Sequence, residues 1–313
     1  MLFTGKLHWN AAFQNSRSVN HLDTIRERRR FLAQTRGLML GLMLALLLSL
    51  SKSLAAQTVI AQISDIHMCD SHSPHAAANL NTAVQMINQQ SVDAVIVSGD
   101  IGEYKACWLK VKSILAAVRA PVYYVPGNHD VHTTDVSVYR SVFGPDYYRV
   151  RIKNVDVIVI DSQLLGNFDN YNSATPPPLP PYTQSLSNHM IAWLTALIPA
   201  EKKAILAGHV VIAVQHIPAY RDSGFPPGTK PYWIINDPYR TKEMNVLHSL
   251  GVKDVLSGHW HYGKVFDAGN IAWHSAPSTG WLPWGGTLGL AIHTISPAGN
   301  VSTEFIELPN QVP

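Results

Sequence analysis

Three side chains of types that bind metals or move protons stand together at Asn128, His129 and Asp130. They follow the apolar run Val122–Val125, which is typical of a buried strand, and Gly127 permits a tight bend between the two. An asparagine amide oxygen can bind a metal, a histidine can bind a metal or transfer a proton, and an aspartate can orient the histidine. The stretch therefore predicts reactive groups at the carboxyl end of a strand.

Four other apolar runs end in ligand-type residues in the same way, and these residues are Asp65 and His67, then Asp100, then His216, then His259 and His261. In an extended segment the pair at 65 and 67 would point to the same side. Because ligands of open α/β sheets gather at the carboxyl ends of strands, we expect all these groups to converge. Together with Asn128 they exceed what one metal needs, and they fit two cations that share a carboxylate. Imidazole and carboxylate favour iron, manganese or zinc over calcium or magnesium.

The order of the motifs, D-x-H, G-D, G-N-H-D, H and G-H-x-H, resembles that of the calcineurin-like metallophosphoesterase superfamily over residues 58–277. The resemblance implies a first metal held by Asp65, His67, Asp100 and His261, and a second held by Asp100, Asn128, His216 and His259. It also implies that His129 touches the substrate phosphate or protonates the leaving oxygen, and that Asp130 orients His129. His216 departs from the pattern, because the family often has two histidines before the proline and Ile217 stands in one of those places.

The resemblance implies hydrolysis of a phosphate ester at two divalent metal ions, through a hydroxide that bridges them. Glu103 stands where purple acid phosphatases have a tyrosine, and the D-R-G motif of the protein phosphatases is absent. The chain is similar to small bacterial class III phosphodiesterases that act on cyclic nucleotides or glycerophosphodiesters, which favours a phosphodiester substrate. The alternatives are a phosphomonoesterase that uses the same site and a non-catalytic exported protein that binds metal or a phospholigand.

Aromatic residues gather in the segments on either side of the last metal motif. They are Tyr220, Phe225, Tyr232 and Trp233 before it, and Trp281 and Trp284 after it. A nucleobase could stack on such rings, or the rings could pack the loops onto the sheets.

The elements that must position these residues alternate at first between strand and helix. Strands are predicted over 58–63, 94–97 and 122–125, with helices over 76–90 and 108–118, and this order implies a parallel sheet. Later strands are predicted over 147–152, 155–160, 210–215 and 254–257, helices over 185–197 and 243–250, and loops over 171–182 and 218–238. Residues 264–307 suggest a meander of antiparallel strands. The resemblance implies an α/β fold, a four-layer α/β/β/α sandwich of two mixed β-sheets.

The first 55 residues have the three parts of an export signal. Arginines at 28–30 precede an uncharged run over 37–51, and small residues follow. Fifteen uncharged residues are short for a membrane span, which needs about 20, and the arginines resemble a bacterial twin-arginine signal. We therefore expect residues 1–55 to direct export to the periplasm or out of the cell, and residues 56–313 to form a single metallophosphoesterase domain. The alternative is an inner-membrane anchor over residues 37–51.

The charge of the chain changes sign when this segment is set apart. Residues 1–55 hold eight of the 24 basic residues and two of the 21 acidic ones, so 16 basic and 19 acidic residues remain. The remainder has no cluster of Lys and Arg of the kind that binds phosphate backbones, which disfavours nucleic acid as the main partner. We expect a small phosphate-ester substrate instead.

The two cysteines, Cys69 and Cys107, lie just beyond the ends of two predicted strands. In an oxidising compartment they could form a disulfide. Sequence alone does not supply the geometry, so a disulfide and two free thiols both remain open.

Overall fold

The computed structural model describes residues 39, 43, 57–131, 136–224 and 230–309. The predicted export signal lies outside these residues apart from positions 39 and 43, and so does the aromatic residue at 225. No helix within the described ranges is long and apolar enough to cross a membrane. The described residues from 57 onward belong to one compact unit.

The first of two mixed sheets has the strand order β11-β10-β1-β2-β3. Its parallel part consists of β1 (Thr58–Ile63), β2 (Ala94–Ser98) and β3 (Val122–Val125). The strand β10 (Gly289–Ile295) pairs antiparallel with β1, and β11 (Val301–Glu307) pairs antiparallel with β10. The predicted β-α-β-α-β order is therefore confirmed, and the carboxyl ends of three parallel strands meet at one edge.

The second sheet has the order β4-β5-β6-β7-β9-β8. Its strands are β4 (Tyr148–Ile152), β5 (Val155–Val159), β6 (Val210–Val214), β7 (Asp254–Ser257), β8 (Lys264–Ala268) and β9 (Ile271–Ser275). The strands β5, β6, β7 and β9 run parallel, while β4 and β8 are antiparallel edge strands.

The predicted antiparallel meander over 264–307 is wrong. The segment forms two separate hairpins: β8–β9 joins the second sheet, where β9 is parallel to β7, and β10–β11 joins the first sheet. Alternation of apolar residues identifies these strands but does not tell which sheet each of them extends.

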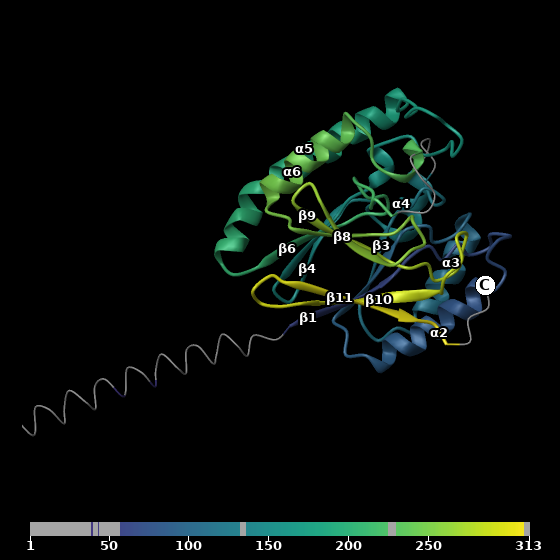
Figure 1. Ribbon diagram of the computed structural model, residues 1–313, viewed down its shortest axis with the longest axis horizontal. Helices are drawn as coiled ribbons and strands as arrows, with labels where there is room; N and C mark the ends of the chain where they lie inside the picture. The colour runs from purple at the N-terminus through teal and green to yellow at the C-terminus, as the bar shows by residue number, and fades with distance from the viewer. Residues whose placement is uncertain (1–38, 40–42, 44–56, 132–135, 225–229, 310–313) are drawn as a thin grey trace, which may run out of the picture. The chain divides into compact units, whose positions relative to one another are not determined.

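Helices cover the outer faces of both sheets (Figure 1). The helices α2 (Ala76–Gln89), α3 (Lys105–Leu115) and α4 (Ser137–Phe143) pack on the first sheet, and α5 (Pro181–Leu206) and α6 (Tyr239–Leu250) pack on the second. Single 3-10 turns occupy Ser162–Leu164 and Pro231–Trp233. The four-layer α/β/β/α sandwich is therefore confirmed.

Two helices differ from the prediction. The short helix α4 was not predicted, and α5 continues through Pro199 to Leu206 instead of ending at residue 197. After the proline, Glu201 is buried and forms an ion pair with Arg149, which stabilises the last turns of α5. Tertiary packing thus outweighs the local cost of a proline inside a helix.

Alternating side chains of the strands fill two kinds of core. Ile60 and Ile96 face the space between the sheets, whereas Ala61 and Val97 face the helices. Because the central strands are buried on both faces, a one-residue shift in their register would move each apolar set to the wrong side. This constraint fixes where each strand ends, and so where the polar residues after it emerge.

The buried carboxyl of Glu243 on α6 gives a prediction for the stability of the fold. Burial raises its pKa from 4.5 to about 8. The folded protein therefore keeps a proton that the unfolded chain loses, and this contribution to stability is complete below pH 4.5 and lost as the pH rises through 8. We expect Glu243→Gln to remove a decline in unfolding free energy on the order of 4 kcal/mol between about pH 5 and 8. Denaturant unfolding of both proteins with a chelator present measures it; parallel pH profiles would contradict it.

Candidate metal centre

Four side chains that the sequence assigns to one metal meet in the structure. Asp65, His67, Asp100 and His261 are buried, and one potential ligand atom of each lies within 4.8 Å of those of the others. His67 Nε2 lies 3.3 Å from His261 Nε2 and 3.6 Å from Asp100 Oδ2, and His261 Nε2 lies 3.4 Å from Asp65 Oδ1. Ligands of a single ion at about 2.1 Å are themselves roughly 3–3.5 Å apart, so these spacings suit a shared cation. We call these residues the first ligand set.

Asp100 also belongs to a second ligand set with His216, His259 and Asn128. The atoms of Asp100, His216 and His259 lie within 4.8 Å of one another, and His216 Nε2 is 3.2 Å from Asp100 Oδ2. Asn128 is buried and lines the same cavity as Asp100 and His259. The structure thus brings together all seven residues predicted to bind metal, with Asp100 common to both sets.

Five of these residues have a backbone conformation that side chains rarely adopt. Positive φ angles occur at Asp65 (53°), His67 (48°), Asp100 (48°), His259 (70°) and His261 (56°). Such angles cost on the order of 1–3 kcal/mol each and persist where the surrounding structure enforces them, which is common at functional sites. The expectation of an extended segment at Asp65 and His67 is therefore wrong: the two side chains converge through a left-handed loop.

Two glycines allow the loops to approach closely enough to form the centre. A Cβ atom on Gly127 would lie 2.2 Å from the backbone nitrogen of Asp100. A Cβ atom on Gly99 would lie 2.4 Å from His216 Nδ1, and Gly99 has a φ of +96°. Gly127 is thus required by close packing against Asp100.

Hydrogen bonds from outside the centre orient the histidines. His216 Nδ1 donates to the carbonyl oxygen of Ser98 at 2.7 Å, and His261 Nδ1 donates to that of Trp281 at 3.0 Å. His259 Nε2 donates to the carbonyl oxygen of Tyr232 at 3.0 Å. Because a carbonyl oxygen only accepts, each bond places the proton on the outer nitrogen and turns the other nitrogen toward the centre as an acceptor.

The inward-facing atoms fit cations. Asn128 donates its Nδ2 outward to the Tyr232 hydroxyl at 2.7 Å, so that Oδ1 faces inward, and the inner atoms of the two aspartates are carboxylate oxygens. Within the described part of the chain, Asn128 Oδ1 is buried without a hydrogen-bond partner, and His216 Nε2 lies 3.2 Å from the Asp100 carboxylate. Acceptors packed together without donors are costly unless a cation satisfies them. The residues therefore fit divalent metal ions.

Burial and charge set the protonation of the centre. Burial would raise the pKa of Asp100, but the surrounding imidazoles hold it well below its usual value. Burial lowers the pKa of His261 to about 4 and that of His259 well below its usual value. Both imidazoles are therefore neutral and can offer a nitrogen lone pair to a cation. Burial also lowers the pKa of His216, but the Asp100 carboxylate outweighs this and raises it to about 9. A cation at His216 must therefore displace a proton.

The sequence profile of a family described as calcineurin-like phosphoesterase matches residues 58–263, about two thirds of the chain. The chain belongs to the calcineurin-like phosphoesterase family. The glycerophosphodiester phosphodiesterase GpdQ of Enterobacter lignolyticus (strain SCF1) is 27% identical over 158 residues, which are 44% of this chain and 50% of that protein. The chain thus spans about half the length of this curated relative.

Solved structures support the phosphoesterase fold. A dimetal phosphatase from Danio rerio superposes with a TM-score of 0.56 at 16% identity, over 80% of this chain and 99% of that one. GAP50, described as the anchor in the inner membrane complex of Plasmodium, gives 0.54 at 16% identity over 81% and 85% of the two chains. At these identities the likeness concerns the fold alone.

His129 of this phosphoesterase stands beside the two ligand sets. Its backbone N–H donates to Asp100 Oδ1 at 2.9 Å, and its Nδ1 lies 3.2 Å from Glu103 Oε1. Burial would lower the pKa of His129, but the carboxylates of Asp100 and Glu103 outweigh it and raise the pKa to about 10. With no cation bound, the imidazole is therefore protonated at neutral pH, and its ring lines the cavity.

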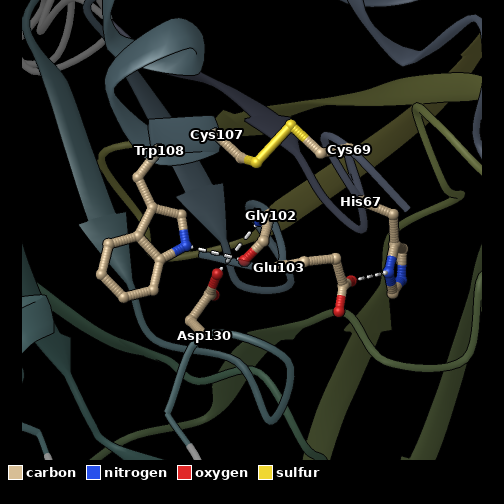
Figure 2. Close-up of a disulfide and its surroundings, with 7 residues drawn as sticks. All are labelled: His67, Cys69, Gly102, Glu103, Cys107, Trp108 and Asp130. Atoms are coloured by element: carbon tan, nitrogen blue, oxygen red, sulfur yellow. Dashed lines mark hydrogen bonds and ion pairs between the residues drawn. A yellow bond between two sulfur atoms is a disulfide. The ribbon is translucent and has the colours of Figure 1, made fainter. Parts of the chain in front are cut away.

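Glu103 is a functional residue that the sequence reasoning missed. Its carboxylate lies 3.6 Å from His67 Nδ1, toward which it points in Figure 2, and 3.2 Å from His129 Nδ1. Burial would raise its pKa, but hydrogen bonds to the two imidazoles lower it to about 2. The only feature of the sequence that could have pointed to Glu103 is its position three residues after Asp100.

Asp130 contacts other groups than predicted. Its carboxylate accepts hydrogen bonds from the backbone N–H groups of Ile101, Gly102 and Gly127 at 2.9, 3.1 and 2.9 Å. The predicted contact with His129 is wrong, because the carboxylate hydrogen-bonded to that imidazole belongs to Glu103. Asp130 instead ties the loop after β2 to the loop after β3, and so holds Asp100 and Asn128 in place.

A disulfide joins Cys69 and Cys107, which settles the question the sequence left open (Figure 2). It links the loop that carries His67 to helix α3. Backbone hydrogen bonds already join the same loops, from His67 N to the Asp100 oxygen at 2.9 Å and from Met68 N to the Ile101 oxygen at 3.1 Å. The disulfide therefore adds a covalent link where hydrogen bonds already join the loops that carry His67 and Asp100, two residues of the first ligand set.

Removing the disulfide is expected to destabilise the protein. The two cysteines are 38 residues apart, and a cross-link closing such a loop stabilises the folded state by about 3–4 kcal/mol. We expect the double variant Cys69→Ala, Cys107→Ala to lose unfolding free energy of this size. A dithiol reductant should lower the stability of the unsubstituted protein and leave that of the variant unchanged; equal stability of both proteins without reductant would contradict the prediction.

A cavity of about 400 Å³ opens beside the ligand sets. Besides Asp100, Asn128, His129, His259 and His261, its walls consist of Phe168, Asp169, Tyr171, Tyr232, Trp233, Trp281, Pro283 and Trp284. Several of the aromatic residues singled out in the sequence therefore line the cavity. A space of this size accepts a small organic ester.

Proposed function

We propose that this phosphoesterase hydrolyses small phosphodiesters with the help of two divalent metal ions. Family membership supports ester hydrolysis at phosphorus, and the two ligand sets support two cations. The donors are imidazoles, carboxylates and one amide, so iron, manganese or zinc is the expected type of ion.

The residues of the chain have distinct tasks in this reaction. Bound cations would neutralise charge on the phosphate and activate a water molecule for attack. Asp100 holds both sets at a common carboxylate, and Asn128 presents an oxygen at the cavity wall. His129, protonated and held by Glu103, donates its proton to the leaving oxygen as the ester bond breaks.

The side chains that line the cavity are the reason for proposing a diester substrate. Among the described residues that line it there is no Lys or Arg, and aromatic rings form most of the wall away from the ligand sets. A monoester dianion is usually held by additional cationic side chains. A diester carries one negative charge and a second organic arm, which suits an uncharged aromatic wall.

A comparison of two substrates with the same leaving group tests the proposal. We expect metal-loaded protein to hydrolyse bis-p-nitrophenyl phosphate with a kcat/KM at least about tenfold above that for p-nitrophenyl phosphate, a difference of ~1.4 kcal/mol. The reverse ratio would indicate a phosphomonoesterase. Binding of phosphate esters without turnover under manganese, iron, zinc or cobalt would indicate a binding protein instead.

We also propose that the protein is exported. The predicted signal over residues 1–55 supports this, and so does the disulfide, because disulfides persist mainly in oxidising compartments. Fractionation of bacterial cells that express the full chain, followed by N-terminal sequencing, tests it. Recovery of full-length protein with reduced cysteines in the cytoplasm would contradict it.

A further inference from the structure

Tyr232 is not part of a metal motif, but it contacts two members of the second ligand set from the same segment between β6 and α6 that carries His216. It lies in the turn Pro231–Trp233, between β6 and α6. Its hydroxyl accepts a hydrogen bond from Asn128 Nδ2 at 2.7 Å, and its backbone carbonyl accepts one from His259 Nε2 at 3.0 Å. The ring packs against the imidazole of His259, with 4.9 Å between centroids.

The hydroxyl decides how well Asn128 can serve as a ligand. An amide has a donor end and an acceptor end, and only the oxygen is useful to a cation. With Nδ2 bonded to Tyr232, Oδ1 faces inward and is buried without a partner. Without the hydroxyl, the buried Nδ2 group of the amide loses its partner, and the orientation that presents Oδ1 to the centre is no longer held.

The carbonyl decides which nitrogen of His259 can bind. Since it accepts the proton on Nε2, the lone pair on Nδ1 is left for the centre. Tyr232 therefore acts on Asn128 through its side chain and on His259 through its backbone. The first ligand set has separate outer partners, such as the Trp281 carbonyl for His261.

We propose that Tyr232 is a positioning residue for the second metal site, and that its hydroxyl sets the affinity of that site through Asn128. This rests on the proposed two-cation centre. The Tyr232 ring is also part of the cavity wall, so the same residue contacts both the second ligand set and the space for the organic arm of the substrate.

The test is metal binding by Tyr232→Phe, which keeps the ring and the backbone carbonyl and removes only the hydroxyl. Metal-free protein is titrated with Mn²⁺, and electron paramagnetic resonance separates single ions from coupled pairs. We expect the unsubstituted protein to bind two ions, and Tyr232→Phe to bind the second about 10–100-fold more weakly with the first unchanged. Equal affinity for both ions in the variant and the unsubstituted protein would overturn the proposal, as would equal weakening of both sites.

Tyr171→Phe is the matched control. The Tyr171 ring lines the same cavity and lies 5.3 Å from that of Tyr232, and the described structure gives its hydroxyl no hydrogen bond to a ligand residue. We expect its two affinities to match those of the unsubstituted protein. An equal loss of second-site affinity in Tyr171→Phe would overturn the role of the Tyr232 hydroxyl. Both substitutions would then weaken the site by altering the cavity wall and not through the hydrogen bond to Asn128.

A double-mutant cycle adds a readout that a merely structural role would not move. In an Asn128→Ala background the hydroxyl has no amide to hold, so Tyr232→Phe should change the second-site affinity little further. Additive effects would overturn the proposal. If the unsubstituted protein binds two ions but turns over no ester, the proposed function fails while the role of Tyr232 stands.

Discussion

Asp100→Asn is expected to lower turnover at least about 1,000-fold and to reduce the metal content of the protein. Asp100 is the only residue found in both ligand sets, so its replacement weakens both sites together. An amide carries no charge and offers a single acceptor oxygen, whereas the carboxylate lies close to His67 Nε2 and His216 Nε2 and accepts from His129 N. Loss of about 4 kcal/mol of transition-state stabilisation corresponds to this factor.

Elemental analysis and turnover of bis-p-nitrophenyl phosphate on the same preparation measure the effect. Asp254→Asn is the matched control, because Asp254 is also a buried carboxylate but bonds His274, at the opposite end of β7 from His259. It should keep its metals and most of its activity. Retention of both ions and unreduced turnover in Asp100→Asn would show that the centre does not depend on a shared carboxylate.

The convergence of seven ligands could be predicted because it depends on local patterns and one topological rule. Each ligand follows an apolar run that is recognisable as a strand, and parallel strands bring their carboxyl ends to one edge. The division into two sets came from the family resemblance, and the structure places Asp65, His67 and His261 around Asp100 as expected. Strand-end position was therefore enough to predict that these side chains meet.

The contacts around the ligands could not be predicted, because they arise where separate loops pack together. Asn128 and Tyr232 are 104 residues apart, and no periodicity indicates that they meet. Whether Glu103 or Asp130 is the partner of His129 depends on how the loops after β2 and β3 pack, because Glu103 is 26 residues away from His129 along the chain while Asp130 is its neighbour. The left-handed backbone at the ligands is likewise enforced by tertiary packing and not by residue type.

The sheet assignment of the last four strands failed for a similar reason. The pattern of β8 to β11 is that of ordinary strands, from which a single antiparallel meander was expected. Membership of one sheet or the other is decided by which open edge accepts each hairpin: β9 completes the parallel edge at β7, and β10 covers the free edge of β1. This outcome brings the loop after β9, with Trp281, against His261.

His129→Gln is expected to slow hydrolysis of a phosphodiester with an alkyl leaving group about 10²–10⁴-fold, the usual contribution of a general acid. An alkoxide is a poor leaving group and needs a proton as the bond breaks. A p-nitrophenolate ion leaves without one, so bis-p-nitrophenyl phosphate should lose much less activity. Steady-state kinetics on the two substrates measure the difference. The side chain of His129 is in neither ligand set but belongs with His67, Asp70 and Glu103 to a further group that could hold an ion, so metal content is measured on the same preparation.

Glu103→Gln is a milder variant that tests the same proton transfer. It keeps the imidazole but removes the carboxylate that raises its pKa, so the acid should lose its proton at lower pH. We therefore expect the rate with an alkyl leaving group to fall earlier as the pH rises, while the rate with p-nitrophenolate follows that of the unsubstituted protein. Equal losses on both substrates in His129→Gln would instead mean that the imidazole binds the phosphate and transfers no proton, because a binding contact is lost regardless of the leaving group.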